Sequence, residues 1–329
     1  MELPTNFVKN VILRQNCKDI MNTMARSVLE LATKDEDPTD ISIPHVLEQS
    51  IKIIATLPLF AVYGYHAYNH YDRNQSLIIH RPDHSLSMAE NILMMLRPDG
   101  KYTPTEAEAL DNALIIHMEH GGGNNSAFTT RVITSAGSDT YSVIAGALLS
   151  LKGPKHGGAN IKVVQMMDDI KANVVDLTDD AELSDYLSKI LRGEAFDGQG
   201  LIYGMGHAVY SISDPRAIQL KQFVCKMAKE KGCEEELDLY ERVARLAPDV
   251  IATKRKSPIK VCVNVDYYSG FLYKMLGIPE ELYTPLFAIA RASGWSAHRI
   301  EELVSSGKII RPAYVSIAKA REYKDISER

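Results

Sequence analysis

The chain has 329 residues with a formal net charge of −5, and 45% of them are apolar, which is ordinary for a globular protein. The mild acidity excludes the excess of lysine and arginine that marks a nucleic-acid-binding surface. The most apolar stretch, residues 51–65, contains Pro58 and Gly64 and is too short to cross a bilayer, so we expect no membrane contact. The N-terminal residues lack the pattern of a signal peptide, which predicts a cytoplasmic protein.

Helical patterns begin near the N-terminus and continue through the middle of the chain. An apolar stripe predicts a helix over residues 20–31, formed by Ile20, Met24, Val28 and Leu31. Leu110 and Leu114 then lead into a segment around His117. A further helix is expected between Asp139 and Gly153, because it has an aspartate where a helix would start and a Gly-Pro where it would end.

The second half of the chain shows the same pattern. A helix is expected from Asp214-Pro215 to a glycine at Gly232, and a long one from Pro279 onward. Residues 259–265 alone favour a short strand. The sequence therefore predicts a nearly all-α protein.

The first segment that interrupts the helical pattern is residues 117–131, with the sequence HMEHGGGNNSAFTTR. Its two histidines have a spacing that also occurs in metal sites. However, the four cysteines of the chain are scattered without a C-x-x-C pair, and no HExxH pattern supplies a further ligand. We therefore expect no metal; the simpler alternative is a buried histidine followed by a capping loop.

Three further segments combine glycine with histidine, arginine or aspartate. His156 lies in GPKHGGAN and His207 in GMGHAVY, where the lone G-x-G lacks the strand–turn–helix context of a dinucleotide fold. Arg216 lies in the first turn of a helix, where an anionic ligand would offset its repulsion from the helix dipole. Asp266, in NVDYYSG, is flanked by aromatic residues that would desolvate a carboxylate and raise its pKa.

Each of these residues alone could be an ordinary loop residue or helix cap. Together they form an acid–base set of imidazoles, a carboxylate and arginines, without the signature of a nucleophilic serine or cysteine. Such a set suits the abstraction of a proton next to a carbonyl group.

These segments, in this order, resemble the signature segments of the citrate synthase family, and the similarity extends to ASGWSAHRIEE after Arg291. The resemblance implies an all-α, two-domain fold in which a small domain of residues 157–271 is inserted into a large domain of residues 1–156 and 272–329. It implies hinges near residues 157–158 and 269–270. It also implies a homodimer with its active site in the interdomain cleft.

The resemblance further implies an acyltransferase of the tricarboxylic acid cycle. The family condenses acetyl-CoA with oxaloacetate and hydrolyses citryl-CoA, without a metal or a prosthetic group. By their places in the motifs, Asp266 would remove a methyl proton, His156 would hydrogen-bond the thioester oxygen, and His207 would polarise the oxaloacetate carbonyl and protonate the new alkoxide.

The remaining site residues also follow from the resemblance. The residues expected to bind oxaloacetate are His120, Asn124, Ser126, His207, Arg216, Arg291 and Arg311, the last contributed by the partner subunit. The residues expected to contact CoA are Leu201, Ile202, Gly204, Met205 and Gly206. Relative to the family, the chain is expected to be shortened at its N-terminus.

Two alternatives stay open at this point. A 2-methylcitrate synthase would perform the same chemistry on propionyl-CoA, and one methylene group changes binding by only about 1–3 kcal/mol. A shortened, non-catalytic homologue would bind metabolites or partners instead. The complete acid–base set favours an enzyme.

Overall fold

The computed structural model describes residues 3–255, 261–305 and 307–328, and no strand occurs in these ranges. The predicted all-α class is confirmed. The helices are α1 (Thr5–Phe7), α2 (Ile20–Leu31), α3 (Ile43–Arg73), α4 (Met88–Leu96), α5 (Pro104–His117), α6 (Asn125–Ser135), α7 (Thr140–Leu151), α8 (Ala159–Asn173), α9 (Asp180–Arg192), α10 (Pro215–Lys231), α11 (Glu234–Arg255), α12 (Val265–Met275) and α13 (Tyr283–Ser305). A π-helix (Val8–Leu13) follows α1, and short 3₁₀ turns lie at Ala32–Lys34, Glu280–Leu282 and Ile326–Glu328.

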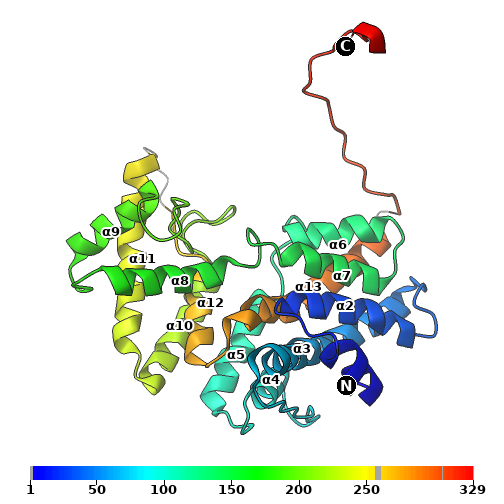
Figure 1. Ribbon diagram of the computed structural model, residues 1–329, viewed down its shortest axis with the longest axis horizontal. Coiled ribbons are helices and arrows are strands. Elements are labelled where there is room, and N and C mark those ends of the chain that lie inside the picture. Colours follow the sequence, from blue (N-terminus) through cyan, green and yellow to red (C-terminus); the bar gives the residue numbers. More distant parts are fainter. Residues whose placement is uncertain (1–2, 256–260, 306, 329) are drawn as a thin grey trace.

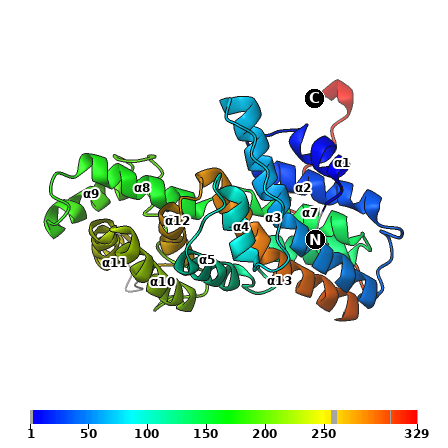
Figure 2. The same cartoon turned by 90° about the horizontal axis from the view of Figure 1, so that it is seen from below.

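The helices gather into two groups, which lie at opposite ends of the molecule (Figures 1 and 2). Helices α8 to α12 pack on one another in one group, and α2, α3, α6, α7 and α13 form the other. Helix α5 contacts members of both groups. The domain boundary predicted at 271/272 falls inside α12, which is one continuous helix that packs against α8. The predicted division into 157–271 and its flanks otherwise stays a prediction.

The helix ends follow the polar residues that flank them. Asp139 caps α7 by accepting a hydrogen bond from the backbone N–H of Ser142, and Asp214 caps α10 in the same way. Gly232 ends α10 with φ +66°, a left-handed conformation that glycine adopts without strain. The three predicted helices over 20–31, after Asp139 and after Asp214 are confirmed.

Helix α3 runs unbroken through Pro58 and Gly64. Pro58 is buried, and packing on both sides of α3 outweighs the roughly 3 kcal/mol that an internal proline costs. Thr23 leaves no room for a side chain at Gly64, since a Cβ there would lie 2.9 Å from Thr23 Cγ2. By length and composition α3 could cross a membrane, but 67% of its most apolar window is buried, and a core helix passes the same test.

The strand expected over residues 259–265 is also not formed as predicted. Residues 259 and 260 lie outside the described ranges, and in the rest Val263 makes only an isolated antiparallel bridge with Met205. The segment forms no longer strand because α12 begins at Val265, two residues after the bridge.

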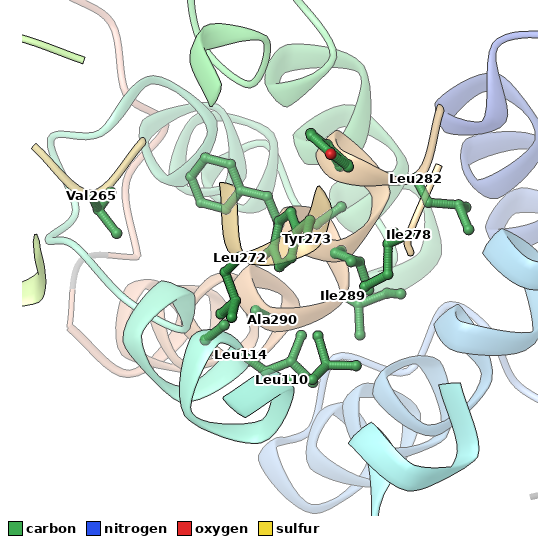
Figure 3. Packing of buried hydrophobic residues seen from close by; sticks show 14 of the residues in the cluster. Leu110, Leu114, Val265, Leu272, Tyr273, Ile278, Leu282, Ile289 and Ala290 are labelled. Atoms are coloured by element: carbon green, nitrogen blue, oxygen red, sulfur yellow. The ribbon is translucent and has the colours of Figure 1, made fainter. Parts of the chain in front are cut away.

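One apolar core joins the helices that carry the conspicuous residues of the sequence. Figure 3 shows side chains from α5, α12 and α13 packed together, namely Leu110, Leu114, Leu272, Tyr273, Ile289 and Ala290. Each fully buried leucine or isoleucine stabilises this packing by about 1.5–3 kcal/mol. The second halves of α5 and α12 and the first half of α13 therefore share one apolar core.

Candidate active site

Two histidines from distant parts of the chain meet at the centre of the site. His120 follows the end of α5, His207 lies in the loop before α10, and their Nε2 atoms are 2.9 Å apart. Tyr210 stacks on the ring of His120, with ring centroids 5.7 Å apart. The backbone N–H of Val209 donates to Nδ1 of His207 at 3.0 Å, so the neutral ring carries its proton on Nε2. His207 therefore presents a hydrogen-bond donor, and His120 accepts it.

Arg216 lies beside this pair and is oriented by Asp214. Its Nε and Nη2 donate to the two carboxylate oxygens of Asp214 at 3.0 and 2.8 Å, and Nη2 lies 3.4 Å from Nε2 of His207. The sequence predicts that an anionic ligand offsets the repulsion between Arg216 and the helix dipole. In the structure Asp214 already does so, because its buried carboxylate pairs with the guanidinium at close range.

A second arginine reaches the site from α13. Arg291 is almost wholly buried, and its Nε donates to the backbone carbonyl of His117 at 2.7 Å. The guanidinium lies over the ring of Phe287, 4.8 Å from its centroid. Within the described ranges Nη1 has no hydrogen-bond partner. A buried cation with an unused donor is costly, so Arg291 is suited to bind an anion.

Asp266 is the second residue of α12, two positions after the cap Asn264. Asn264 accepts a hydrogen bond from the backbone N–H of Asp266, which fixes the first turn. Burial raises the pKa of Asp266 to about 6, although the charges of Arg216 and Arg291 act to lower it. In the described residues no ion pair reaches its carboxylate. The group is therefore a base that can take a proton near neutral pH.

The loop of residues 201–206 is bonded to the segment that leads into Asp266. The backbone N–H of Asn264 donates to the carbonyl of Gly204, its side-chain amide donates to the carbonyl of Gly206, and Gly206 donates to Cys262. Gly204 has φ +77°, and a Cβ there would lie 2.7 Å from Tyr267 Cδ2. Of the other residues predicted to contact CoA, Leu201 is half exposed, Ile202 is buried, and Met205 forms the bridge described above.

His156 is held by a second network. Its Nε2 lies 2.9 Å from Oγ of Ser126, which also contacts Oδ1 of Asn124 at 2.9 Å and accepts from the indole N–H of Trp295 at 3.1 Å. Ser126 is wholly buried. Its hydroxyl group is thus occupied by protein partners, which places Ser126 behind His156 and suits it to orient that ring.

The imidazoles of the site are neutral at pH 7. Burial lowers the pKa of His120 to about 4, with Arg216 adding to the effect, and lowers the pKa values of His156 and His207. A neutral imidazole can donate one hydrogen bond and accept another. No group of three metal-ligating side chains occurs in the described residues.

Arg311 is the one predicted residue that lies apart from the others. It is exposed in an extended C-terminal segment that leads away from the body of the molecule (Figure 1). The preceding Ile310 donates from its backbone N–H to Oγ of Ser135, the last residue of α6. The first turn of α6 carries Ser126, so Arg311 is roughly 15 Å from its own site by helix length.

Sequence reasoning missed several side chains that shape the site. Tyr210 and Trp295 support the two histidine networks, and Asn264 caps α12. The Asn-x-Asp pattern at residues 264–266 is a recognisable cap signal. No local pattern indicates the contact of Trp295 with Ser126, because the two are 169 positions apart.

Residues 1–313 match the family model described as "Citrate synthase, C-terminal domain". The chain is 35% identical to the citrate synthase of Corynebacterium glutamicum over 304 residues, which cover 90% of this chain and 65% of that relative. It is 32% identical to 2-methylcitrate synthase 1 of the same organism, over 94% of this chain and 75% of that one. The chain thus spans just under two thirds of the length of the first relative.

Among solved structures, the chain resembles a citrate synthase from Thermoplasma acidophilum, which was determined as a ternary complex with carboxymethyl coenzyme A and oxaloacetate. The TM-score is 0.80 at 26% identity, over all of this chain and 81% of that one. The similarity includes both groups of helices, because the whole of this chain is covered.

Proposed function

The chain belongs to the citrate synthase family, and we propose that it condenses acetyl-CoA with oxaloacetate and hydrolyses the resulting citryl-CoA to citrate and CoA. One observation carries this proposal: Asp266, with a pKa of about 6, lies within the electrostatic reach of two arginines that can hold an anion. This arrangement combines a base for the carbon acid with a receptor for the acceptor substrate.

Oxaloacetate is a dianion, and the proposal assigns its two carboxylates to cationic side chains. Arg216 keeps one edge of its guanidinium after pairing with Asp214, and Arg291 keeps its unpartnered Nη1. Bidentate guanidinium–carboxylate pairs provide both affinity and orientation. His120 and Asn124 would be further ligands, with Ser126 acting through His156.

The base acts on the second substrate. Asp266 takes a proton from the methyl group of acetyl-CoA, and His156 hydrogen-bonds the thioester oxygen as the enolate forms. Charge then develops on oxygen next to a pre-oriented neutral imidazole rather than in water, which lowers the barrier. The loop of residues 201–206 would contact CoA, and its bonds to the 262–264 segment support this by linking it to the base.

The new carbon–carbon bond forms when the enolate attacks the ketone of oxaloacetate. His207 donates from Nε2 to the ketone oxygen and gives up this proton as that oxygen becomes an alkoxide. The fixed tautomer supports this role, because the backbone N–H groups of residues 209 and 210 leave the proton only on Nε2. Water then cleaves the thioester of citryl-CoA and releases CoA.

The direct test is the loss of thioester absorbance when the purified protein is mixed with acetyl-CoA and oxaloacetate. We expect turnover that depends on both substrates, and citrate as the product. The same assay with propionyl-CoA decides between the two enzyme activities, since the similarity to a 2-methylcitrate synthase favours neither. Absence of turnover with both thioesters would favour a non-catalytic homologue.

We further propose a cytoplasmic homodimer that needs no prosthetic group and in which Arg311 completes the partner's site. The position of Arg311, about one helix length from its own site, supports an intersubunit role. Mixing Arg311→Ala with His207→Ala protein should then create one sound site in each mixed dimer. After full exchange, about a quarter of the wild-type sites should function. No recovered activity in mixed dimers verified by mass would refute the shared site.

A further inference from the structure

The loop that carries His120 is attached to α13 at one small region. Glu119 contacts Nε2 of His298 through Oε1 at 2.9 Å, and the same oxygen accepts a hydrogen bond from the backbone N–H of Gly121. His298 contacts Glu301 on its other side, with Nδ1 3.2 Å from Oε2. The loop therefore wraps around one side of this imidazole.

Two glycines make this close approach possible. A Cβ at Gly294 would lie 2.2 Å from Oε2 of Glu119 and 2.4 Å from the carbonyl oxygen of Met118, so only glycine fits there. A Cβ at Gly122 would lie 3.2 Å from Cε1 of His298. The carboxylate of Glu119 and the backbone of Met118 therefore both pack directly against α13.

The same carboxylate is a near neighbour of the buried cation of the site. The charge of Glu119 acts on Arg291, which lies one turn before Gly294 on α13. Burial alone would raise the pKa of Glu119, but the hydrogen bonds from His298 and Gly121 hold it below its usual range, so the group is ionised. Glu119 therefore fixes the position of its chain neighbour His120 and also balances part of the charge of Arg291.

We propose that the Glu119–His298 pair is a positioning device that holds His120 at the distance from α13 needed to bind a dicarboxylate. This inference rests on the proposed function and adds to it, because neither residue touches the reacting atoms. A displaced loop would separate His120 from His207 while leaving Asp266 and the CoA loop in place. Loss of the pair should therefore impair oxaloacetate binding selectively.

The variants Glu119→Gln and His298→Ala remove the charge and the donor, respectively. We expect the Kd of each for oxaloacetate, measured by calorimetry, to rise about 10-fold, which is typical of losing a hydrogen bond to a charged group. The KM for acetyl-CoA should change by less than about 2-fold. His298→Gln should restore most of the affinity, because its amide nitrogen can replace Nε2 as the donor to Glu119.

The matched control is Glu301→Gln. Glu301 contacts the same imidazole but is highly exposed and does not touch the loop, so this variant should bind oxaloacetate like the wild type. Equal affinities in Glu119→Gln and the wild type would overturn the proposal. So would a parallel loss of affinity for both substrates together with a lowered melting temperature, which would indicate general damage to the fold.

A second readout needs no turnover. In protein with ¹⁵N-labelled histidine, the ring signals of His120, assigned with His120→Gln, should shift in Glu119→Gln and not in Glu301→Gln. If the wild type neither turns over nor binds oxaloacetate, the proposed function fails, and these signals still decide whether the pair positions His120. Unchanged His120 signals in Glu119→Gln would overturn the inference in that case as well.

Discussion

The N-terminal ends of α10 and α12 each present an aspartate close to the site, Asp214 as the cap and Asp266 in the first turn, and the two carboxylates have opposite properties. Asp214 is buried but paired twice with Arg216, and these contacts outweigh desolvation and hold its pKa below the usual range. Asp266 has no such partner in the described residues, and desolvation raises its pKa to about 6. The same residue type at the same end of a helix is thus a fixed anion in one place and a base in the other.

The difference arises from one neighbouring guanidinium group. A cation next to a carboxylate stabilises the charged form and lowers its pKa. Burial of an unpaired carboxylate away from water destabilises the charged form and raises its pKa. Arg216, satisfied on one edge by Asp214, is left rigid and cationic for a substrate. In the proposed function, Arg216 with Asp214 would therefore form the binding half of the site, and Asp266 its reactive half.

The variant Asp266→Asn should abolish most of the turnover and leave oxaloacetate binding intact. The amide is nearly isosteric but cannot accept the proton, so we expect turnover to fall by about 10² to 10⁴. Oxaloacetate binding, measured by calorimetry, should change little. Turnover close to that of the wild type would mean that another group is the base.

The variant Asp214→Asn should do the reverse. Losing the anion releases Arg216 and leaves a partly buried guanidinium underpaired, which should lower the free energy of unfolding by about 2–3 kcal/mol. The KM for oxaloacetate should rise more than kcat falls. Denaturant titration and steady-state kinetics measure the two effects; an unchanged KM would show that Arg216 does not need this carboxylate for its orientation.

The pH dependence sharpens the comparison. Because Asp266 must be ionised to act, kcat/KM for acetyl-CoA should fall about tenfold per pH unit below its pKa of about 6. The pKa of Asp266 in the folded state lies above the ordinary 3.8, so its ionisation destabilises the fold. This loss of stability builds up as the pH rises between the two values and is complete above the higher one. Asp266→Asn should thus gain about 3 kcal/mol of stability over the wild type at pH 8 and almost none at pH 3. Equal differences at both pH values would contradict this assignment.

The smallest expected effect is a change of shape on substrate binding. Oxaloacetate that bridges Arg216 of α10 and Arg291 of α13 would draw the two groups of helices together. A hinge near residues 269–270 would have to bend α12 where it is tightly packed, since a Cβ at Gly270 would lie 2.7 Å from the carbonyl oxygen of Asn160. We place it instead at residues 276–279, where Gly277 has φ +68°. Small-angle scattering should show a smaller radius of gyration with saturating oxaloacetate; an identical profile would oppose closure.

Local patterns in the sequence predicted the parts of the fold that local interactions determine. The caps at Asp139 and Asp214 and the stripe over residues 20–31 became helices as expected. The prediction failed at the strand over residues 259–265, and no local pattern indicated that tertiary packing would carry α3 through the helix breaker Pro58.

The site shows the same division between local and tertiary information. The motif residues around His120, His207 and Arg216 are brought together, as are Ser126 and His156. The partners that tune them come from positions more than a hundred residues away, such as His298 against Glu119 and Trp295 against Ser126. Periodicity and capping rules carry no information on such pairs, because these contacts exist only after the helices have packed.

The central claim is that Asp266 is the desolvated base and Asp214 the fixed anion. Carboxyl signals of protein labelled with ¹³C-aspartate, titrated by NMR and assigned with the two asparagine variants, measure both pKa values without turnover. We predict a midpoint near pH 6 for Asp266 and one below the ordinary value of 3.8 for Asp214. A midpoint for Asp266 at or below 3.8 would contradict the account.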